Sequence, residues 1–170
     1  MMCGITGTPG TGKSSAAEEL AGRGHPVVHL THTVHAYIIG RDRERDTAVI
    51  DEDRWAREFT PVRGFVEGHL AHLLPCDRVV VLRCRPERLL ARLSSRGYGE
   101  EKCRENAEAE ALDVCLIETL ERHPPEHVFE LDATGIQPGE VADLIEGFLA
   151  GRIPPVHGRI DWSGYLAGEA

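Results

Sequence analysis

The sequence lacks any long apolar run. No uninterrupted run exceeds the length of Val79–Leu82, whereas a membrane-spanning helix needs roughly 18 apolar residues, so no contact with a membrane is expected. A surplus of positive charge is also missing, because the formal net charge is −9; direct binding to RNA is therefore not expected. The first motif begins as early as Gly7, which leaves no room for a secretory signal and predicts a cytoplasmic protein.

Paired cysteines are absent as well. The 5 cysteines are odd in number and form no CxxC motif, so we expect free thiols in a reducing compartment rather than a disulfide framework. These residues are Cys3, Cys76, Cys84, Cys103 and Cys115. Lysine is scarce, since all but two of the 19 basic residues are arginine. These two are Lys13 and Lys102, and the placement of Lys13 is therefore informative.

Short apolar segments alternate with helical ones along the chain. Strands are expected at residues 2–6, 26–30, 62–67, 78–82 and 127–131. Helices are expected at 14–23, 86–96, 101–122 and 138–149, with two short helices around an arginine-rich middle in 31–57. This order predicts an α/β fold with a five-stranded parallel sheet covered on both faces. Residues 1–150 are predicted to form one domain, and residues 151–170 a tail laid on its surface.

The strongest motif is Gly7–Ser14, which reads GTPGTGKS between a predicted strand and a predicted helix. This is the complete GxxxxGK[ST] pattern of a P-loop in the context it requires. The glycines let successive N–H groups face one anion, and the N-terminus of the helix favours negative charge. Lys13 is expected to reach the β- and γ-phosphates of a nucleotide, and Ser14 to ligate Mg²⁺. The guanine-reading NKxD motif of GTPases is absent, which favours a small nucleotide or metabolite kinase.

A second candidate group follows the strand expected at 62–67. Ligands of an open parallel sheet bind beyond the carboxyl ends of its strands, where Glu67 and His69 are expected. We predict that Glu67 holds Mg²⁺ through a water and that His69 orients an attacking water or hydroxyl group. The structural alternatives are a solvated strand end for Glu67 and a packing role for His69.

Two arginines end the helix expected at 86–96. Arg92 and Arg96 are four residues apart and share one helix face, and their planar guanidinium groups suit a phosphoryl group in transfer. Gly97 and Gly99 around Tyr98 suit a lid that closes over a nucleotide. The alternative is a helix that ends in surface arginines.

Two further patterns are less specific. Asp51–Arg54 reads either as a border of an acceptor site or as a capped helix start. The spacing of His29, His32 and His35 could indicate a metal, but neither a cysteine nor a matched second pair accompanies them, so structural zinc is not expected.

Taken together, these motifs resemble the adenylate kinase isoenzyme 6 family, which comprises the coilin-interacting nuclear ATPase and its archaeal relatives. The segments that carry the resemblance are GTPGTGKSS at 7–15, VIDEDR at 49–54, VEGHLAHLLP at 66–75, RLSSRGY at 92–98 and KCRENAEAE at 102–110. The resemblance implies a P-loop nucleotide kinase that uses ATP and Mg²⁺ to phosphorylate a nucleoside monophosphate. AMP is the usual acceptor, and the family also implies an ATPase activity.

The resemblance also implies roles for individual residues. ATP would be bound by Gly10, Gly12, Lys13, Ser14, Ser15 and Arg96. Residues 30–49 would form the monophosphate-binding segment and residues 95–105 a short lid. A role in maturation of the small ribosomal subunit is implied too, with a ribosomal protein as partner.

Three departures from the family pattern concern the site. Ser14 and Ser15 stand where threonines are common, and Glu67 stands where eukaryotic members have an aspartate. The monophosphate-binding segment matches only loosely. Its candidate residues are His32, His35, Arg41, Arg43 and Arg45.

Two other functions stay open beside a monophosphate kinase. The chain could be an assembly ATPase whose hydrolysis switches a binding state, or a kinase for another acceptor such as shikimate or dephospho-coenzyme A. We favour a bifunctional enzyme with in-line transfer of the γ-phosphoryl group. In it, Lys13 and the loop amides hold ATP while Arg92 and Arg96 neutralise the developing charge.

Overall fold

The computed structural model describes residues 1–42 and 47–168. Its main feature is a five-stranded parallel sheet in the order β2-β5-β1-β6-β7. The strands are β1 (Met2–Thr6), β2 (Val27–His29), β5 (Gly64–Glu67), β6 (Arg78–Arg83) and β7 (Val128–Asp132). Each strand lies in a segment where the sequence predicts one, so the predicted α/β fold with five parallel strands is confirmed.

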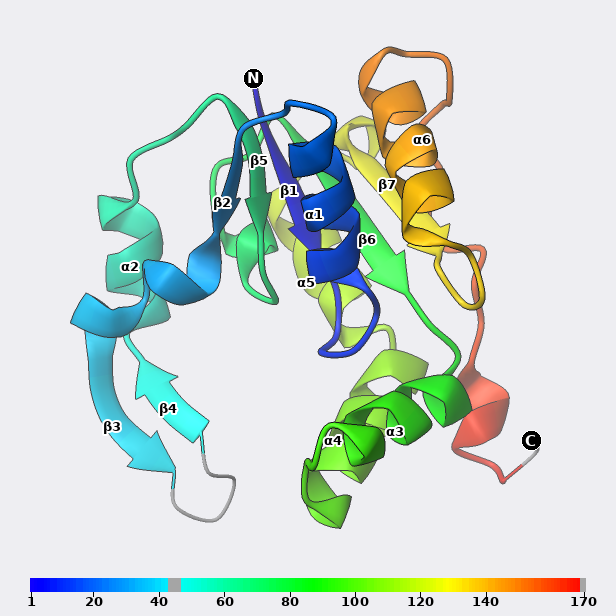
Figure 1. Ribbon diagram of the computed structural model, residues 1–170. Helices are drawn as coiled ribbons and strands as arrows, with labels where there is room; N and C mark the ends of the chain where they lie inside the picture. Colours follow the sequence, from blue (N-terminus) through cyan, green and yellow to red (C-terminus); the bar gives the residue numbers. More distant parts are fainter. Residues whose placement is uncertain (43–46, 169–170) are drawn as a thin grey trace.

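One face of the sheet is covered by α1 (Lys13–Gly22) and α6 (Pro138–Leu149), as Figure 1 shows. Alternate strand residues point to this face, among them Ile5 and Leu82, and they pack against Leu20 and Ile145 of the helices. All four side chains are fully buried, and each burial contributes about 1.5–3 kcal/mol.

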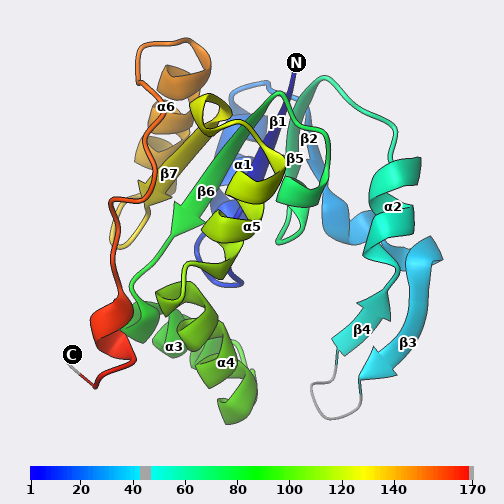
Figure 2. The ribbon, with the colours of Figure 1, turned by 180° about the vertical axis from the view of Figure 1, so that it is seen from behind.

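The opposite face, seen in Figure 2, is covered by α5 (Val114–Arg122). The 3₁₀ turn η3 (Ala71–Leu73) packs beside α5, and η4 (Pro125–His127) leads into β7. The intervening strand residues, such as Val66 and Val81, fill this half of the core together with Leu116 and Trp55. Because side chains on a strand alternate between faces, the apolar strands β1, β5 and β6 can supply both halves of the core.

Residues 30–58 differ from the prediction of two short helices. They contain the single turns η1 (Leu30–His32) and η2 (His35–Tyr37), then the antiparallel hairpin β3 (Ile38–Asp42) and β4 (Thr47–Ile50), and finally α2 (Glu52–Glu58). The hairpin was missed although its β-branched residues favour strands. Asp51 begins α2 by accepting a hydrogen bond from the Arg54 N–H at 3.0 Å.

The helix predicted over 101–122 is in fact two helices. After α3 (Pro86–Ser95), α4 (Glu100–Ala111) ends before α5 begins, and Asp113 between them has a left-handed φ of 57°. The break follows from Arg83, which donates to the Glu110 carbonyl at 2.9 Å and pairs with the Asp113 carboxylate. A distant guanidinium group therefore caps α4 and stabilises the turn.

Residues 151–168 run back along the edge of the sheet (Figure 2). The Glu130 N–H of β7 donates to the Val156 carbonyl at 2.7 Å. Further on, the Arg85 guanidinium lies 5.3 Å from the centre of the Trp162 ring, just before the turn η5 (Ser163–Tyr165). Within residues 1–42 and 47–168, none of the helices has the length and apolar character needed to cross a membrane.

A buried histidine links β1 to α5. His72 is fully buried, with Nδ1 2.8 Å from the Thr6 hydroxyl and Nε2 3.0 Å from the Glu118 carboxylate. Burial lowers the pKa of His72 to about 4, although Glu118 opposes this shift. Because the Glu118 carboxylate only accepts, the neutral ring donates from Nε2 to Glu118, and the Thr6 hydroxyl donates to the His69 carbonyl at 2.9 Å.

We predict that this histidine makes the fold sensitive to acid. In the unfolded chain His72 takes up a proton near pH 6.5, whereas in the folded chain it does so only near pH 4. The free energy of unfolding should therefore fall between these values, by up to about 3 kcal/mol. Urea unfolding at a series of pH values should show that His72→Gln removes this part of the slope. An identical slope in both proteins would contradict the prediction.

Candidate functional site

The P-loop lies between β1 and α1, at the carboxyl ends of the parallel strands (Figure 1). Its first residue, Gly7, has a φ of +140°, and a Cβ there would lie 2.3 Å from the Leu82 carbonyl oxygen. Only glycine lets the loop press this closely against β6. Gly12, with a φ of +104°, then starts α1. The loop therefore has the curled backbone that a phosphate cradle requires.

Lys13 is folded against this loop. Its ammonium group donates to the Gly7 carbonyl at 2.8 Å and to the Thr8 carbonyl at 2.9 Å, and the side chain is only 8% exposed. Burial lowers the pKa of Lys13 to about 8, while the carboxylate of Glu67 opposes the shift. The group is thus a positive charge with little water around it, which strengthens its attraction for an anion.

The buried carboxylate of Glu67 joins the ends of β5 and β2 to the first turn of α1. It accepts a hydrogen bond from the Ser14 hydroxyl at 3.2 Å and a second from His29 Nδ1 at 2.8 Å. The adjoining carboxylate and hydroxyl oxygens are hard donors that suit Mg²⁺. The contact of His29 with Glu67 was missed in the sequence, although His29 ends β2, the strand beside β5.

His69 lies on the other side of the loop. Its Nδ1 is 3.1 Å from the Gly7 carbonyl, and because a carbonyl only accepts, Nδ1 carries the proton. Partial desolvation, together with the charge of Lys13, lowers the pKa of His69. The ring is therefore neutral at physiological pH, and Nε2 carries the lone pair that can accept a proton.

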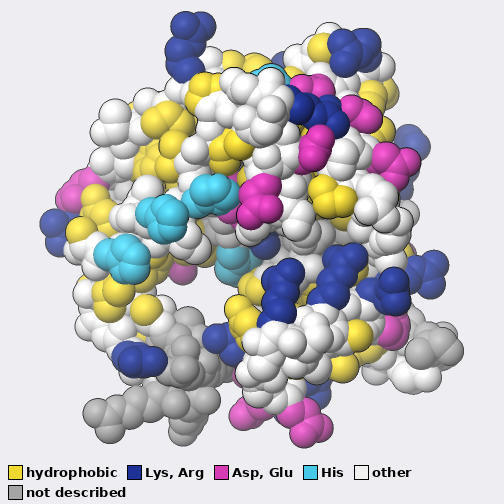
Figure 3. Space-filling model, in the orientation of Figure 1, with side chains coloured by type: hydrophobic (Ala, Val, Ile, Leu, Met, Phe, Trp, Pro, Cys, Tyr) yellow, Lys and Arg dark blue, Asp and Glu magenta, His cyan; other side chains and the backbone are white. Residues whose placement is uncertain are grey.

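A cavity of about 510 Å³ lies between α3 and α6. Arg88, Arg92 and Arg96 line one side of it, and Gly12 and Ser15 its floor. Arg92 also donates to the Gly10 carbonyl at 3.1 Å, so it touches the loop directly. Basic side chains gather on this face in Figure 3. Arg88 was not predicted for the site, although it continues the four-residue spacing of Arg92 and Arg96.

The far wall of this cavity comes from residues 133–138, which follow β7. No motif in the sequence marks this loop. The sequence could still have predicted that this loop lies at the site, because it follows a strand and all strands of a parallel sheet end at the same edge.

A second cavity of about 430 Å³ lies between the end of β5 and the hairpin β3–β4. His69, Trp55, Leu30 and Val49 line it, and so does Glu52 of the acidic segment predicted to border an acceptor. Figure 3 shows that the molecule is hollowed between the hairpin side and the α3–α4 side.

The other residues predicted for the monophosphate-binding segment do not line this cavity where the structure describes them. His32 and His35 are exposed, and Arg41 lies on β3 outside the lining of the cavity. Arg43 and Arg45 fall outside the described residues.

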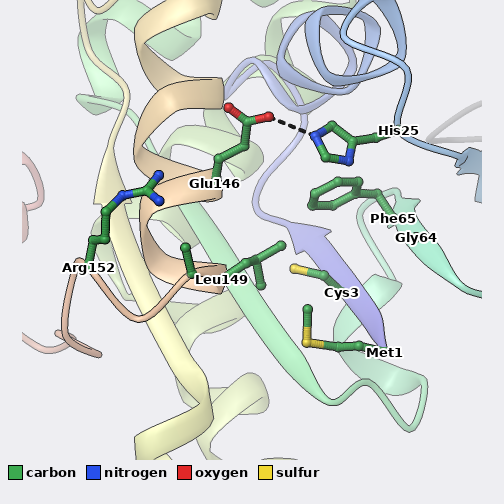
Figure 4. Close-up of a pocket in the computed structure, with 9 residues that line it drawn as sticks. Met1, Cys3, His25, Gly64, Phe65, Glu146, Leu149 and Arg152 are labelled. Carbon is green, nitrogen blue, oxygen red and sulfur yellow. Dashed lines mark hydrogen bonds and ion pairs between the residues drawn. The ribbon is translucent and has the colours of Figure 1, made fainter.

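A third pocket, of about 530 Å³, lies at the opposite, amino ends of the strands (Figure 4). His25 Nε2 lies 2.7 Å from the Glu146 carboxylate there. The ring of Phe65 and the thiol of Cys3 lie beside this pair in Figure 4. None of the site residues predicted from the sequence lines this pocket. Lys13, Glu67, His69, Arg92 and Arg96 all lie at the carboxyl edge, at the other end of the sheet from this pocket.

Comparison with known proteins supports the assignment of the loop. Residues 3–113 match the protein family described as an AAA domain. The chain is 43% identical over 169 residues to a "Putative adenylate kinase" of Natronomonas pharaonis, covering 98% of this chain and 100% of that protein. It is 44% identical over 173 residues to the protein of the same name from Methanothermobacter thermautotrophicus, covering 99% and 100%. The chain belongs to the family of these archaeal proteins.

The resemblance found in the sequence is thereby confirmed, and solved structures agree on the fold. A deoxyadenosine kinase from M. mycoides with bound dATP superposes with a TM-score of 0.53 at 15% identity, over 88% of this chain and 100% of that one. A sugar kinase from Janibacter gives 0.57 at 17% identity, over 88% and 94%. At such low identity these two structures support the fold alone.

The scarcity of lysine allows a direct test of the buried ammonium group. In spectra of ¹³C-lysine-labelled protein, the Cε signal of Lys13 should titrate near pH 8 because burial disfavours its charge. Lys102→Arg assigns the signal, since Lys13 is then the only lysine. Glu67→Gln should lower the midpoint further, because the carboxylate stabilises the ammonium. A midpoint near the ordinary value of 10.5 would contradict the prediction.

Proposed function

We propose that this chain is an ATP-dependent nucleoside monophosphate kinase with AMP as its favoured acceptor. The observation that carries the proposal is the pair of cavities that flank one P-loop, one beside α3 and α6 and the other beside the hairpin. A phosphoryl transferase needs two such sites, because donor and acceptor must meet in line at the γ-phosphate. The names of the archaeal relatives support adenylate as the substrate.

The cavity beside α3 suits the donor. Its floor is the P-loop, so ATP would lay its phosphates along the loop amides and place its nucleoside between Arg96 and residues 133–138. Arg92 bridges the cavity and the loop through Gly10. Residues 95–105, which form the corner between α3 and α4, would act as the lid that excludes water.

The cavity beside the hairpin suits the acceptor. Its apolar wall of Leu30, Val49 and Trp55 can hold a base, and its inner end is His69 beside the P-loop. Residues 30–49 would thus form the monophosphate-binding segment of a kinase domain that spans residues 1–150.

Transfer would depend on charge held in fixed positions. Lys13 and the loop amides stabilise the phosphates, while Arg92 and Arg96 neutralise charge on the transferring group. Mg²⁺ would be held by Ser14 and, through water, by Glu67, and it would supply further neutralisation of the phosphate oxygens.

ATP hydrolysis is proposed as a second activity. The neutral ring of His69, with its proton on Nδ1, leaves Nε2 free to accept a proton from water. The alternative function, an assembly ATPase, would use this same group. The ribosomal partner and the cytoplasmic location stay predictions from the sequence.

A turnover assay tests the proposal. ADP formation from Mg-ATP should depend strongly on AMP, and less on dAMP, CMP, UMP or GMP. Lys13→Ala should lower the rate by several orders of magnitude, because it removes the positive charge nearest the phosphates. Arg152→Ala, at the opposite end of the sheet, is the matched control. If no monophosphate raises the rate of ADP formation above that of hydrolysis alone, the kinase proposal is wrong and the assembly ATPase takes its place.

The role of His69 has its own test. His69→Ala should lower ATP hydrolysis by at least about tenfold, because a positioned base is lost. Phosphorylation of AMP should fall less, since the acceptor's own phosphate is already ionised. Both rates are measured on one preparation whose melting temperature matches the wild type. An equal loss of both activities would remove the case for a water-orienting histidine.

A further inference from the structure

Thr8 is the centre of the hydrogen bonds inside the P-loop. Its carbonyl accepts from the Lys13 ammonium at 2.9 Å, and also from the Thr11 hydroxyl at 2.9 Å and the Thr11 N–H at 3.3 Å. This carbonyl and that of Gly7 are the two acceptors that hold the Lys13 charge in place. Whatever orients Thr8 therefore helps to position Lys13.

The side chain of Thr8 is fixed from outside the loop. Its hydroxyl donates to the carboxylate of Glu110 at 2.5 Å, across 102 residues of sequence. Both residues are buried, with Thr8 3% and Glu110 1% exposed. A hydrogen bond to a charged acceptor in such a place is short and strong.

Glu110 is itself held rigidly. Its other carboxylate oxygen accepts from Arg83 Nε at 2.7 Å and from the Cys84 N–H at 3.1 Å. Arg83, which is 1% exposed, also pairs with Glu130 of β7 and with Asp113. The carboxylate thus has partners on both oxygens and little freedom to move.

Glu110 stands at the end of α4, the helix that begins in the proposed lid. α4 packs along α3, which carries Arg92 and ends just before Arg96. A shift of α4 would therefore reach the P-loop through the bond between Glu110 and Thr8.

We propose that Glu110 is a positioning residue for nucleotide binding: through Thr8 it holds one of the two P-loop carbonyls that place Lys13, and it joins the loop to the helix of the lid. The inference deepens the proposed function and rests on it only for the identity of the nucleotide. Neither Glu110 nor the Thr8 hydroxyl needs to touch the phosphates for this role.

Thr8→Val is the sharpest test, because it keeps the shape of the side chain and removes its hydroxyl. ATP binding is measured by titration calorimetry, and turnover with AMP on the same protein. We expect the Kd for ATP to rise about tenfold, the size of effect for a lost hydrogen bond to a charged group. The KM for AMP and the melting temperature should stay close to the wild type, and Thr8→Ser should restore ATP binding.

Two further variants separate positioning from general damage. Thr119→Val removes an equally buried hydroxyl that donates to the Cys115 carbonyl of its own helix at 2.6 Å, and it should leave ATP binding unchanged. In a Glu110→Gln background, Thr8→Val should have a smaller effect, because the strong acceptor is already lost.

Each outcome is decisive. Wild-type affinity in Thr8→Val, or equal losses in Thr8→Val and Thr119→Val, would overturn the role of Glu110. A wild-type protein that binds ATP yet transfers no phosphoryl group would overturn the kinase proposal, while the binding data would still test Glu110.

Discussion

The ammonium group of Lys13 is buried, and the loop that carries it supplies its acceptors. A buried charge without partners is costly, so the carbonyls of Gly7 and Thr8 must point inward at the lysine. This requirement bends the loop into a path that glycine alone permits at Gly7. The surrounding groups then follow: Glu67 balances the charge, and His69 donates to the carbonyl of Gly7.

Arg83 is a second buried cation whose partners fix the surrounding elements. It is a buried cation in contact with three carboxylates, those of Glu110, Asp113 and Glu130. Removing one member of such a cluster leaves an unpaired charge, at a cost of roughly 3–5 kcal/mol. The cluster ends α4 and joins β6 to β7, and its Glu130 also accepts from the Gly158 N–H at 2.7 Å. The proposed lid, the sheet and the final segment are thus tied to one side chain.

The parallel sheet explains why the site lies where it does. Residues distant in sequence, such as Lys13, Glu67 and Arg92, come together because β1 and β5 end at one edge and α3 begins just beyond β6. The same rule leaves the pocket around His25 and Glu146 at the other edge, away from the loop. The two cavities that flank the P-loop then give the arrangement from which we infer transfer between two nucleotides.

The sheet and most of the candidate site could be predicted from the sequence, because they depend on residues close together in the chain. The five strands are short apolar segments bounded by turns, and the P-loop is a contiguous motif whose glycines and lysine have fixed spacing. Glu67 and His69 follow a recognisable strand, and Arg92 and Arg96 share a helix face. Each of these patterns depends on neighbours within about one turn or strand of the chain.

What the tertiary structure decided depends on partners far apart. The break between α4 and α5 exists because Arg83, some 30 residues earlier, binds Glu110 and Asp113. The contact of His29 with Glu67 and the bond from Thr8 to Glu110 likewise leave no local pattern. The sequence by itself determined the sheet, the P-loop and the family, because these rest on local geometry. Only the fold decided how the loop is held, because that needs charges brought together from β6, β7 and α4.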